Sequence, residues 1–252
     1  MTRAPRFPAV LQWLLGPWIA ITIVGAFYYA PLAQGFLGQS SRILFFHVPM
    51  AWVSFLAFVT AGLWSLRYLA GGRSPEHDRA AAAAVELGLL FGVLATVTGA
   101  LWAKVMWGAY WNWDPRQTSI VIALLFYAAY LALRGAVADA PTRGRLSAAY
   151  ASLGLAVSPF LFFVLPRLGF TLHPEPVLNT AGKIEMESRM VQVLLLSVAG
   201  FTLLFFWLHS LACRIAERTE AAERSDSTAR AEAAERSEST PRVGALALET
   251  DR

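Results

Sequence analysis

Six long apolar stretches constrain the fold of this chain more than any other feature of its sequence. Each approaches the roughly 20 residues that a helix needs to cross a bilayer, and 56% of the 252 residues are hydrophobic, too many for a soluble domain of this size. Lipid offers no partner for free backbone groups, and the runs are continuous rather than alternating. The sequence therefore predicts an all-α integral membrane protein with six transmembrane helices, at approximately Leu11–Ala30, Val48–Leu69, Ala84–Ala103, Ser119–Val137, Ala148–Leu165 and Met190–Cys213.

Lysine and arginine residues predict the orientation of these helices. Ten of them fall at the N-terminus, in the second and fourth loops and at the start of the C-terminal tail, against six in the other three loops. Short loops rich in Lys and Arg stay in the cytoplasm, so both termini are expected there and the other three loops are expected to face outward. The net charge of +4 sums regions of opposite sign, so it does not indicate nucleic-acid binding. The single cysteine, Cys213, excludes an internal disulfide and any CxxC site.

The second outward loop, within about 102–119, contains the sequence W-G-A-Y-W-N-W-D-P-R-Q-T-S. It places Trp107, Tyr110, Trp111 and Trp113 beside one acid, Asp114. Tryptophans that merely line the membrane surface do not reach this density, so the cluster predicts a binding surface for a large flat ligand. The ordinary membrane-surface role is expected for the other tryptophans: Trp13, Trp18, Trp52, Trp64, Trp102 and Trp207.

Two structural readings compete for this loop. If the segment were helical, Trp107, Trp111 and Asp114 would share one stripe, as in an amphipathic helix lying on the membrane. Pro115 disfavours helical geometry at the residue before it. Asp114 is equally suited to cap the next helix, with Pro115 at the first helical position.

Two of the four histidines are expected on the same face as this loop. His47 stands in F-F-H-V-P at the outer mouth of the second span, and His173 stands in T-L-H-P-E-P in the last outer loop, whereas His77 and His209 fall on the cytoplasmic side. Two neutral imidazoles and an aromatic surface suit an iron porphyrin, although a histidine at a helix end is often only an interfacial polar residue. Candidate partners for the propionates are the outer-loop cations: Arg42, Lys104, Arg116, Arg167, Lys183 and Arg189.

These residues resemble the WWD-domain haem-handling proteins of cytochrome c biogenesis. The six spans, and R-I-L-F-F-H-V-P-M-A-W before the second of them, are similar to the cytochrome c maturation protein C (haem exporter protein C) family from about Leu11 to Cys213. The resemblance implies that haem b binds without a covalent bond on the outer face, with His47 and His173 as axial ligands to the iron. It also implies a role for the signature residues: Trp107, Gly108, Trp111, Trp113, Asp114 and Arg116, with Tyr110 among them. Gly108 is expected to let the loop backbone approach the porphyrin.

The resemblance further implies a delivery function in the bacterial inner membrane. The family passes haem to a periplasmic membrane-anchored haem chaperone, working beside ABC-type transporter subunits and a small membrane subunit. No catalytic motif is found in the chain, so an independent enzyme is not expected. Two other classes stay open: a b-type haem protein for electron transfer, which would normally hold paired histidines inside helices, and a scaffold or transporter subunit without this ligand.

The C-terminal residues form a region of their own. Glu217–Thr228 and Ala229–Thr240 match at nine of twelve positions, with mixed charge and almost no large apolar side chains. Such a segment cannot bury enough surface to fold alone. The chain is therefore expected to comprise a membrane domain over residues 1–216 and a disordered cytoplasmic tail over residues 217–252. This tail is expected to be solvated and partly helical rather than a helix that docks a partner.

Overall fold

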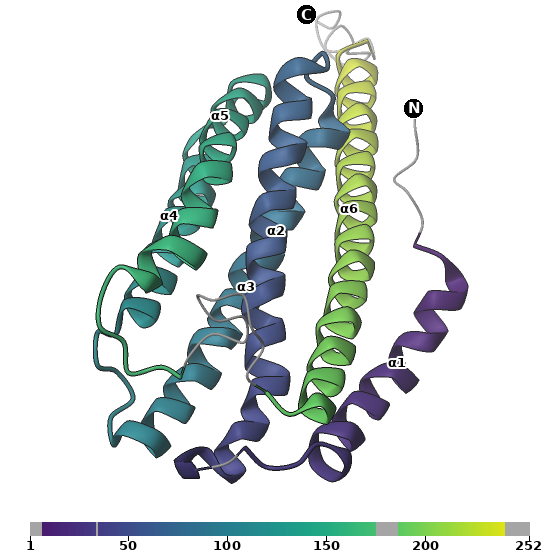
Figure 1. Ribbon diagram of the computed structural model, residues 1–252. Helices are drawn as coiled ribbons and strands as arrows, with labels where there is room; N and C mark the ends of the chain where they lie inside the picture. The colour runs from purple at the N-terminus through teal and green to yellow at the C-terminus, as the bar shows by residue number, and fades with distance from the viewer. Residues whose placement is uncertain (1–6, 34, 175–185, 240–252) are drawn as a thin grey trace, which may run out of the picture. The chain divides into compact units, whose positions relative to one another are not determined.

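The computed structural model describes residues 7–33, 35–174 and 186–239, and Figure 1 shows a bundle of long helices. Within these described residues, six helices are long and apolar enough to cross a membrane, so the prediction of a six-span membrane protein is confirmed. The α-helices are α1 (Ala9–Val24), α2 (Leu44–Ala70), α3 (Pro75–Trp107), α4 (Pro115–Ala136), α5 (Ala140–Pro159) and α6 (Ser188–Ser239). Short π or 3₁₀ segments adjoin α1, α2 and α5: Gly25–Tyr29, Gly35–Leu37, Gln39–Ile43, Phe160–Val164 and Leu165–Arg167.

Several helices begin before their apolar runs because polar residues cap them. The side chain of Ser74 accepts from the Glu76 N–H at the start of α3 (3.3 Å), and Asp139 accepts from the Thr142 N–H at the start of α5 (2.9 Å). These caps satisfy backbone donors that would otherwise have no partner at a helix N-terminus. At the other end of α5, a π segment follows directly after Pro159, as expected where proline disturbs the helical hydrogen bonds.

The central helices α2 and α3 pack against neighbours on two sides. One buried cluster joins them to α4 and α5, where the rings of Phe58 and Tyr127 stack at 3.6 Å. A second joins them to α6 through Val53, Phe91 and Phe205. α1 packs against the start of α6, where the Trp18 indole donates to the carbonyl of Leu196 (2.9 Å). In this arrangement α2 and α3 are the centre of the packed helices.

The two ends of the bundle differ in composition. At one end lie residues 30–43, the loop 108–114 and residues 168–174, which we call the tryptophan end. At the opposite end lie the loop between α2 and α3 and the loop between α4 and α5, which we call the arginine end (Figure 1). His47, Asp114 and His173 therefore share one end, whereas His77 belongs to the other.

The chain divides into two units, Met1–Cys213 and Arg214–Arg252. The described part of the tail is helical as far as Ser239, so the expectation of a partly helical tail is confirmed and that of disorder does not hold for this part. Alanine, glutamate and arginine favour helices, and ion pairs one turn apart support them: Arg224–Glu220 at 3.2 Å and Arg230–Asp226 at 2.8 Å. The side chains of the tail over residues 221–236 are exposed, as a solvated tail requires.

Candidate functional site

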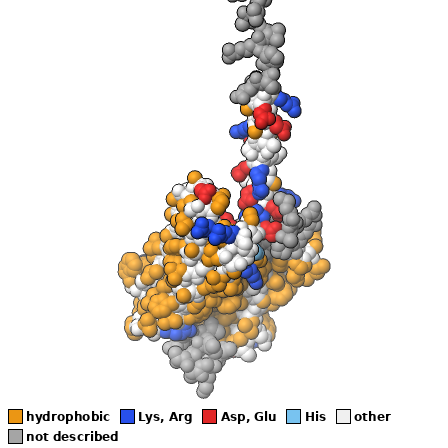
Figure 2. All heavy atoms as spheres, turned by 90° about the horizontal axis from the view of Figure 1, so that it is seen from above, with side chains coloured by type: hydrophobic (Ala, Val, Ile, Leu, Met, Phe, Trp, Pro, Cys, Tyr) orange, Lys and Arg blue, Asp and Glu red, His pale blue; other side chains and the backbone are white. Residues whose placement is uncertain are grey.

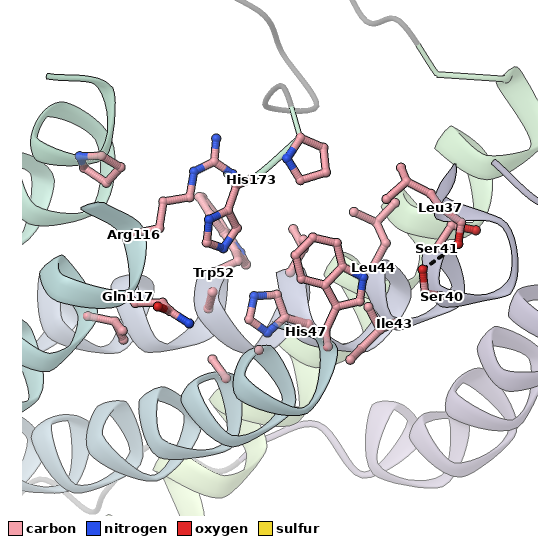
Figure 3. A pocket seen from close by; sticks show the side chains of 18 of the residues that line it. Leu37, Ser40, Ser41, Ile43, Leu44, His47, Trp52, Arg116, Gln117 and His173 are labelled. Atoms are coloured by element: carbon pink, nitrogen blue, oxygen red, sulfur yellow. Dashed lines mark hydrogen bonds between the residues drawn. The ribbon is translucent and has the colours of Figure 1, made fainter. Parts of the chain in front are cut away.

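A cavity of about 1250 Å³ opens at the tryptophan end. Its walls come from α2, α3, the start of α4, the π segment after α5 and residues around His173. Most lining side chains are apolar, and Figure 3 shows His47, Arg116, Gln117 and His173 projecting into this space. The volume exceeds the roughly 300–1000 Å³ of ordinary small-molecule pockets, so it suits a large, mainly apolar ligand with a few polar groups.

His47 lies in the first turn of α2 and is oriented by α3. Its Nδ1 is 3.1 Å from the hydroxyl of Thr98. That hydroxyl already donates to the carbonyl of Leu94 (2.8 Å), so it accepts from the Nδ1–H of His47. The ring also lies against Gly99, where an added Cβ would be 2.9 Å from Cε1 of His47. Nε2 of His47 is left with its lone pair available for a ligand.

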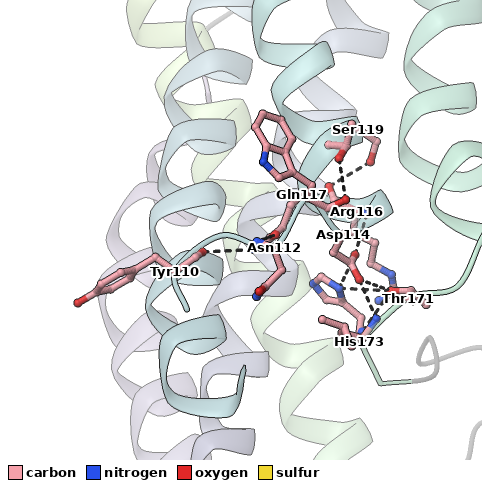
Figure 4. A network of polar contacts seen from close by, with 11 residues as sticks. Tyr110, Asn112, Asp114, Arg116, Gln117, Ser119, Thr171 and His173 are labelled. Carbon is pink, nitrogen blue, oxygen red and sulfur yellow. Dashed lines mark hydrogen bonds and ion pairs between the residues drawn. The ribbon is translucent and has the colours of Figure 1, made fainter. Parts of the chain in front are cut away.

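His173 is oriented by Asp114, from a loop 59 positions away in sequence. The Nδ1 of His173 lies 2.8 Å from Oδ1 of Asp114 (Figure 4). The Asp114 side chain is fully buried, and 16% of the His173 side chain is exposed. A carboxylate on one ring nitrogen fixes the tautomer and directs the other nitrogen, as in carboxylate–histidine–metal arrangements. This contact leaves Nε2 of His173 free of Asp114, with a lone pair that could bind a metal.

Asp114 joins three segments of the chain through its two carboxylate oxygens. Oδ1 accepts from the backbone N–H of Arg116 (2.9 Å), as an N-cap of α4. Oδ2 accepts from the hydroxyl of Thr171 (2.8 Å) and the backbone N–H of Leu172 (2.7 Å). Burial raises the pKa of Asp114, but these hydrogen bonds and the neighbouring His173 outweigh burial and lower the pKa below its ordinary value. Asp114 is therefore a fixed anion, and its predicted capping role is confirmed.

Burial controls the protonation of His173. Burial is the largest cause that lowers its pKa, Asp114 opposes burial, and Arg116 and His47 add to the lowering; together they bring the pKa of His173 to about 4. The imidazole is therefore neutral at pH 7, and its contact with Asp114 is a hydrogen bond from a neutral Nδ1–H. A neutral imidazole keeps the lone pair that iron requires.

Two tryptophans surround His173. Trp102 stacks on its ring at 5.9 Å, and Trp107 meets it edge-on at 4.9 Å. Trp102 also lines the cavity, and so does Trp52. The prediction of a membrane-surface role is therefore wrong for Trp102, which packs on His173. Trp52 borders the cavity and is also 38% exposed, so its predicted surface role stays a prediction. Each stands on a long apolar helix, and only helix packing reveals that it borders the cavity.

The tryptophan-rich loop is not a helix lying on the membrane. α3 ends at Trp107, and the residues from there to Asp114 are not helical. The buried side chain of Gln117 holds this loop: its amide oxygen accepts from the Asn112 N–H (2.9 Å) and its NH₂ donates to the Tyr110 carbonyl (3.3 Å) (Figure 4). The alternative of an amphipathic surface helix is therefore excluded.

The signature residues divide into two groups around the cavity. Trp111 and Arg116 line it. Tyr110 and Trp113 point to the outside of the protein, with 56% and 72% of their surface exposed. Trp113 has a positive φ of 55°, rare for a residue with a large side chain. The loop thus presents one aromatic ring to the cavity and two to its surroundings.

Gly108 has a structural role that was not predicted. It is the left-handed C-cap of α3, with φ of 78° and its N–H bonded to the Lys104 carbonyl (3.1 Å). A Cβ at Gly108 would have no atom within 4 Å. The position needs glycine for its backbone conformation. Gly108 does not line the cavity, and its close approach to a porphyrin stays a prediction.

The cations predicted as partners for the propionates also fall into two groups: those that line the cavity and those that do not. Arg116 and Arg167 line the cavity. The others that the structure describes are engaged elsewhere: Arg42 with Gln39 (3.0 Å), Lys104 with the Gly108 carbonyl (2.8 Å) and Arg189 with Glu187 (3.3 Å). Lys183 lies outside the described residues.

The donor set suits a porphyrin better than a bare ion. Among the described residues there is no group of three or more His, Cys, Asp or Glu side chains that could hold a metal ion. A porphyrin brings four nitrogen ligands of its own, so iron then needs only one or two axial ligands from the protein. Two imidazoles beside an aromatic, mainly apolar cavity fit that need.

Sequence reasoning missed the residues that support the two histidines: Thr98, Gly99, Trp102, Gln117 and Thr171. A threonine or a glycine inside an apolar run carries no distinguishing signal. Gln117 follows directly after the signature residues. A polar side chain at the start of a membrane helix was therefore the one available indication of a supporting residue.

Comparison with known proteins bears on what this cavity receives. A family model described as "Heme exporter protein C" matches residues 3–230. The heme exporter protein C of Bradyrhizobium diazoefficiens is 34% identical over 206 residues, covering 81% of this chain and 78% of that protein. That of Escherichia coli K12 is 30% identical over 215 residues, covering 79% and 82%. An Arabidopsis thaliana protein named "Putative cytochrome c biosynthesis ccmC-like mitochondrial protein" is 28% identical over 188 residues, covering 73% and 68%. The likeness spans nearly the whole membrane unit, and on this basis the chain belongs to the heme exporter protein C family.

Proposed function

We propose that this chain binds haem b without a covalent bond in the cavity at the tryptophan end. Nε2 of His47 and Nε2 of His173 are the axial ligands to iron. The observation that carries the proposal is that each Nδ1 is already paired, with Thr98 at 3.1 Å and with Asp114 at 2.8 Å. Both imidazoles are thereby held in the tautomer that offers Nε2 to a metal.

The walls of the cavity supply the remaining interactions. The rings of Trp52, Trp102 and Trp111 line it, and flat aromatic faces pack well on a porphyrin. Arg116 and Arg167 are the cations of the lining, and guanidinium groups pair with carboxylates such as the haem propionates. Trp107 acts behind this wall by holding the ring of His173 at 4.9 Å.

The two ligands suit capture followed by release. His47 stands on a long helix and is fixed by α3, so it is the permanent ligand. His173 stands on a loop after the π segment of α5 and is held by the Asp114 hydrogen bond and two tryptophans. A ligand from another protein can replace His173 at iron more easily, because only a loop has to move.

We further propose that the haem is delivered to a periplasmic membrane-anchored haem chaperone for cytochrome c maturation. In this role the chain works in the bacterial inner membrane with ABC-type transporter subunits and a small membrane subunit, with both termini in the cytoplasm. The family supports the haem-handling role. The exposed rings of Tyr110 and Trp113 lie in the same loop as the cavity residue Trp111, and exposed aromatic residues are typical of protein interfaces.

An absorption spectrum tests the binding proposal. The detergent-purified protein is reconstituted with haem, and the Soret band of the wild type is compared with those of His47→Ala and His173→Ala. His77→Ala is the matched control, since His77 lies at the arginine end. We expect a shifted or weakened band in both site variants and an unchanged band in the control. Wild-type spectra for both site variants would refute the assignment of the ligands.

A further inference from the structure

A second cavity lies at the arginine end, between the last turn of α2 and the first turns of α5. Its volume is about 410 Å³. It is lined by three apolar and three polar residues: Leu69, Leu146, Ala149, Arg73, Thr142 and Arg145. No residue of the first cavity contributes to it, so it is a separate site, and the inference drawn from it does not depend on haem binding.

The two guanidinium groups of this cavity have no counter-ion in the described part of the chain. Neither the Arg73 nor the Arg145 side chain has a hydrogen bond or ion pair with a described residue. The contrast with Arg134 at the same end is clear, because Arg134 meets both carboxylate oxygens of Asp78, at 2.7 and 2.9 Å. Arginine is always charged, so two unpaired arginines in one cavity are available to an anion.

The acid nearest to this cavity does not neutralise it. Asp139 caps α5 by accepting hydrogen bonds from Thr142, and it interacts electrostatically with Arg143; neither Asp139 nor Arg143 lines the cavity. If the charges of Asp139 and Arg143 offset each other, the charges of Arg73 and Arg145 remain as a net positive charge in the cavity.

The backbone around Arg73 is unusual. Gly72 and Arg73 are both left-handed, with φ of 82° and 63°, and the N–H of Arg73 is bonded to the Tyr68 carbonyl (3.1 Å). A left-handed conformation is easy for glycine and strained for arginine. Strain of this kind persists where the surrounding structure enforces it, often at a binding site.

The apolar half of the lining indicates what sort of anion fits. Leu69 and Leu146 are 41% and 45% exposed, and they belong to helices that cross the membrane. Figure 2 looks onto the arginine end and shows Lys and Arg side chains bordered by hydrophobic ones. A soluble anion would use only the arginines, whereas a lipid places its phosphate at them and its acyl chains along the leucines. Basic pockets between membrane helices are known to bind anionic lipid headgroups.

We propose that this cavity is a binding site for one anionic phospholipid of the phosphatidylglycerol type. The phosphate diester lies between Arg73 and Arg145, and the first methylene groups of its chains lie against Leu69 and Leu146. A bound lipid there would link the ends of α2 and α5 and fix the depth of the bundle in the membrane.

Native mass spectrometry of the full-length protein in detergent tests this proposal. Short-chain phosphatidylglycerol is titrated against phosphatidylcholine of the same chain length, and against glycerol phosphate as a soluble anion. We expect the protein to retain one phosphatidylglycerol molecule in preference to phosphatidylcholine and to glycerol phosphate. Arg145→Gln should weaken that binding about fivefold, the usual effect of one cation near anionic lipid, and Arg145→Lys should retain most of it.

The matched control is Arg143→Gln, two positions away on the same helix and outside the cavity. We expect it to bind the lipid as the wild type does. Equal loss in Arg143→Gln and Arg145→Gln would mean a diffuse charge effect and overturn the site. Equal binding of phosphatidylcholine, or displacement by glycerol phosphate at the same concentration as lipid, would overturn the choice of an anionic phospholipid. Arg73→Gln gives an independent second measurement, with the same fivefold loss expected.

Discussion

The hydrogen bonds of Asp114 allow a sharp prediction for Asp114→Asn. Asparagine has the same shape but one oxygen instead of two, and both carboxylate oxygens are used. Oδ1 accepts from the Arg116 N–H and from Nδ1 of His173, and Oδ2 accepts from the Leu172 N–H and the Thr171 hydroxyl. The amide can be turned in two ways. In each of them the NH₂ group replaces an oxygen that had accepted from a backbone N–H, either that of Arg116 or that of Leu172, and this N–H is left without an acceptor.

The magnitude follows from this loss. A buried donor left without an acceptor costs about 1–3 kcal/mol, which is the expected loss of folding stability. If the amide NH₂ faces His173, the imidazole must accept at Nδ1 and carry its proton on Nε2, so it offers no lone pair to iron. Loss of such a supporting carboxylate typically weakens metal affinity about 10- to 100-fold. We therefore expect haem affinity to fall by that factor in Asp114→Asn.

The assay is a double-mutant cycle read by haem titration at the Soret band. If Asp114 acts on haem only through His173, then Asp114→Asn should have little further effect in a His173→Ala background. Thermal unfolding of the same four proteins separates stability from affinity. Additive losses of haem affinity in the double variant would refute the reasoning, because they would mean that Asp114 acts on haem independently of His173.

Three further predictions concern the same cavity. His173 has a pKa of about 4 when folded against about 6.5 when unfolded, so its contribution to stability is present above pH 6.5 and is lost as the pH falls through that interval. Haem titrations at pH 5 should accordingly resemble those at pH 7, because about 90% of His173 is still neutral, and binding should weaken below pH 4. Gly99→Ala places a Cβ 2.9 Å from Cε1 of His47, so the ring must move and the Soret maximum should shift. Trp102→Ala removes the ring stacked on His173 and should cost about 1–3 kcal/mol of haem affinity, measured by titration.

Matched controls make these predictions decisive. Gly16→Ala adds a Cβ with no atom within 4 Å, and Trp13→Ala removes a ring that is 83% exposed. Both should leave the haem spectrum unchanged. A Soret shift in Gly16→Ala as large as that in Gly99→Ala would contradict the steric explanation. Haem affinity falling at the ordinary histidine pKa would show that burial does not control His173.

The features that the sequence predicted are those governed by local chemistry. Apolar runs long enough to cross a bilayer give the helices, and Asp114 with Pro115 gives the start of α4. The tryptophan-rich segment predicted a binding surface, and the cavity lies at the end of the bundle that contains this segment. Boundaries were less accurate, because capped polar turns such as Ser74–Glu76 extend helices beyond their apolar runs.

Other features required knowledge of which helix faces pack together. Trp52 and Trp102 resemble membrane-surface tryptophans in sequence, yet both line the cavity. Gly108 resembles a point of close ligand approach, yet it ends α3 in a left-handed turn. His47 lies inside α2 rather than before it, so its position alone does not separate this chain from an electron-transfer haem protein.

The sequence by itself determined a six-span membrane protein with its aromatic loop and two histidines at one end, because hydrophobic length and residue type act locally. Only the tertiary structure decided how those histidines are presented. Thr98 comes to His47 from α3, and Asp114 comes to His173 across 59 positions of sequence. Such contacts depend on how helices pack and on how loops return to them. Composition and periodicity describe one segment at a time, so they cannot contain that information.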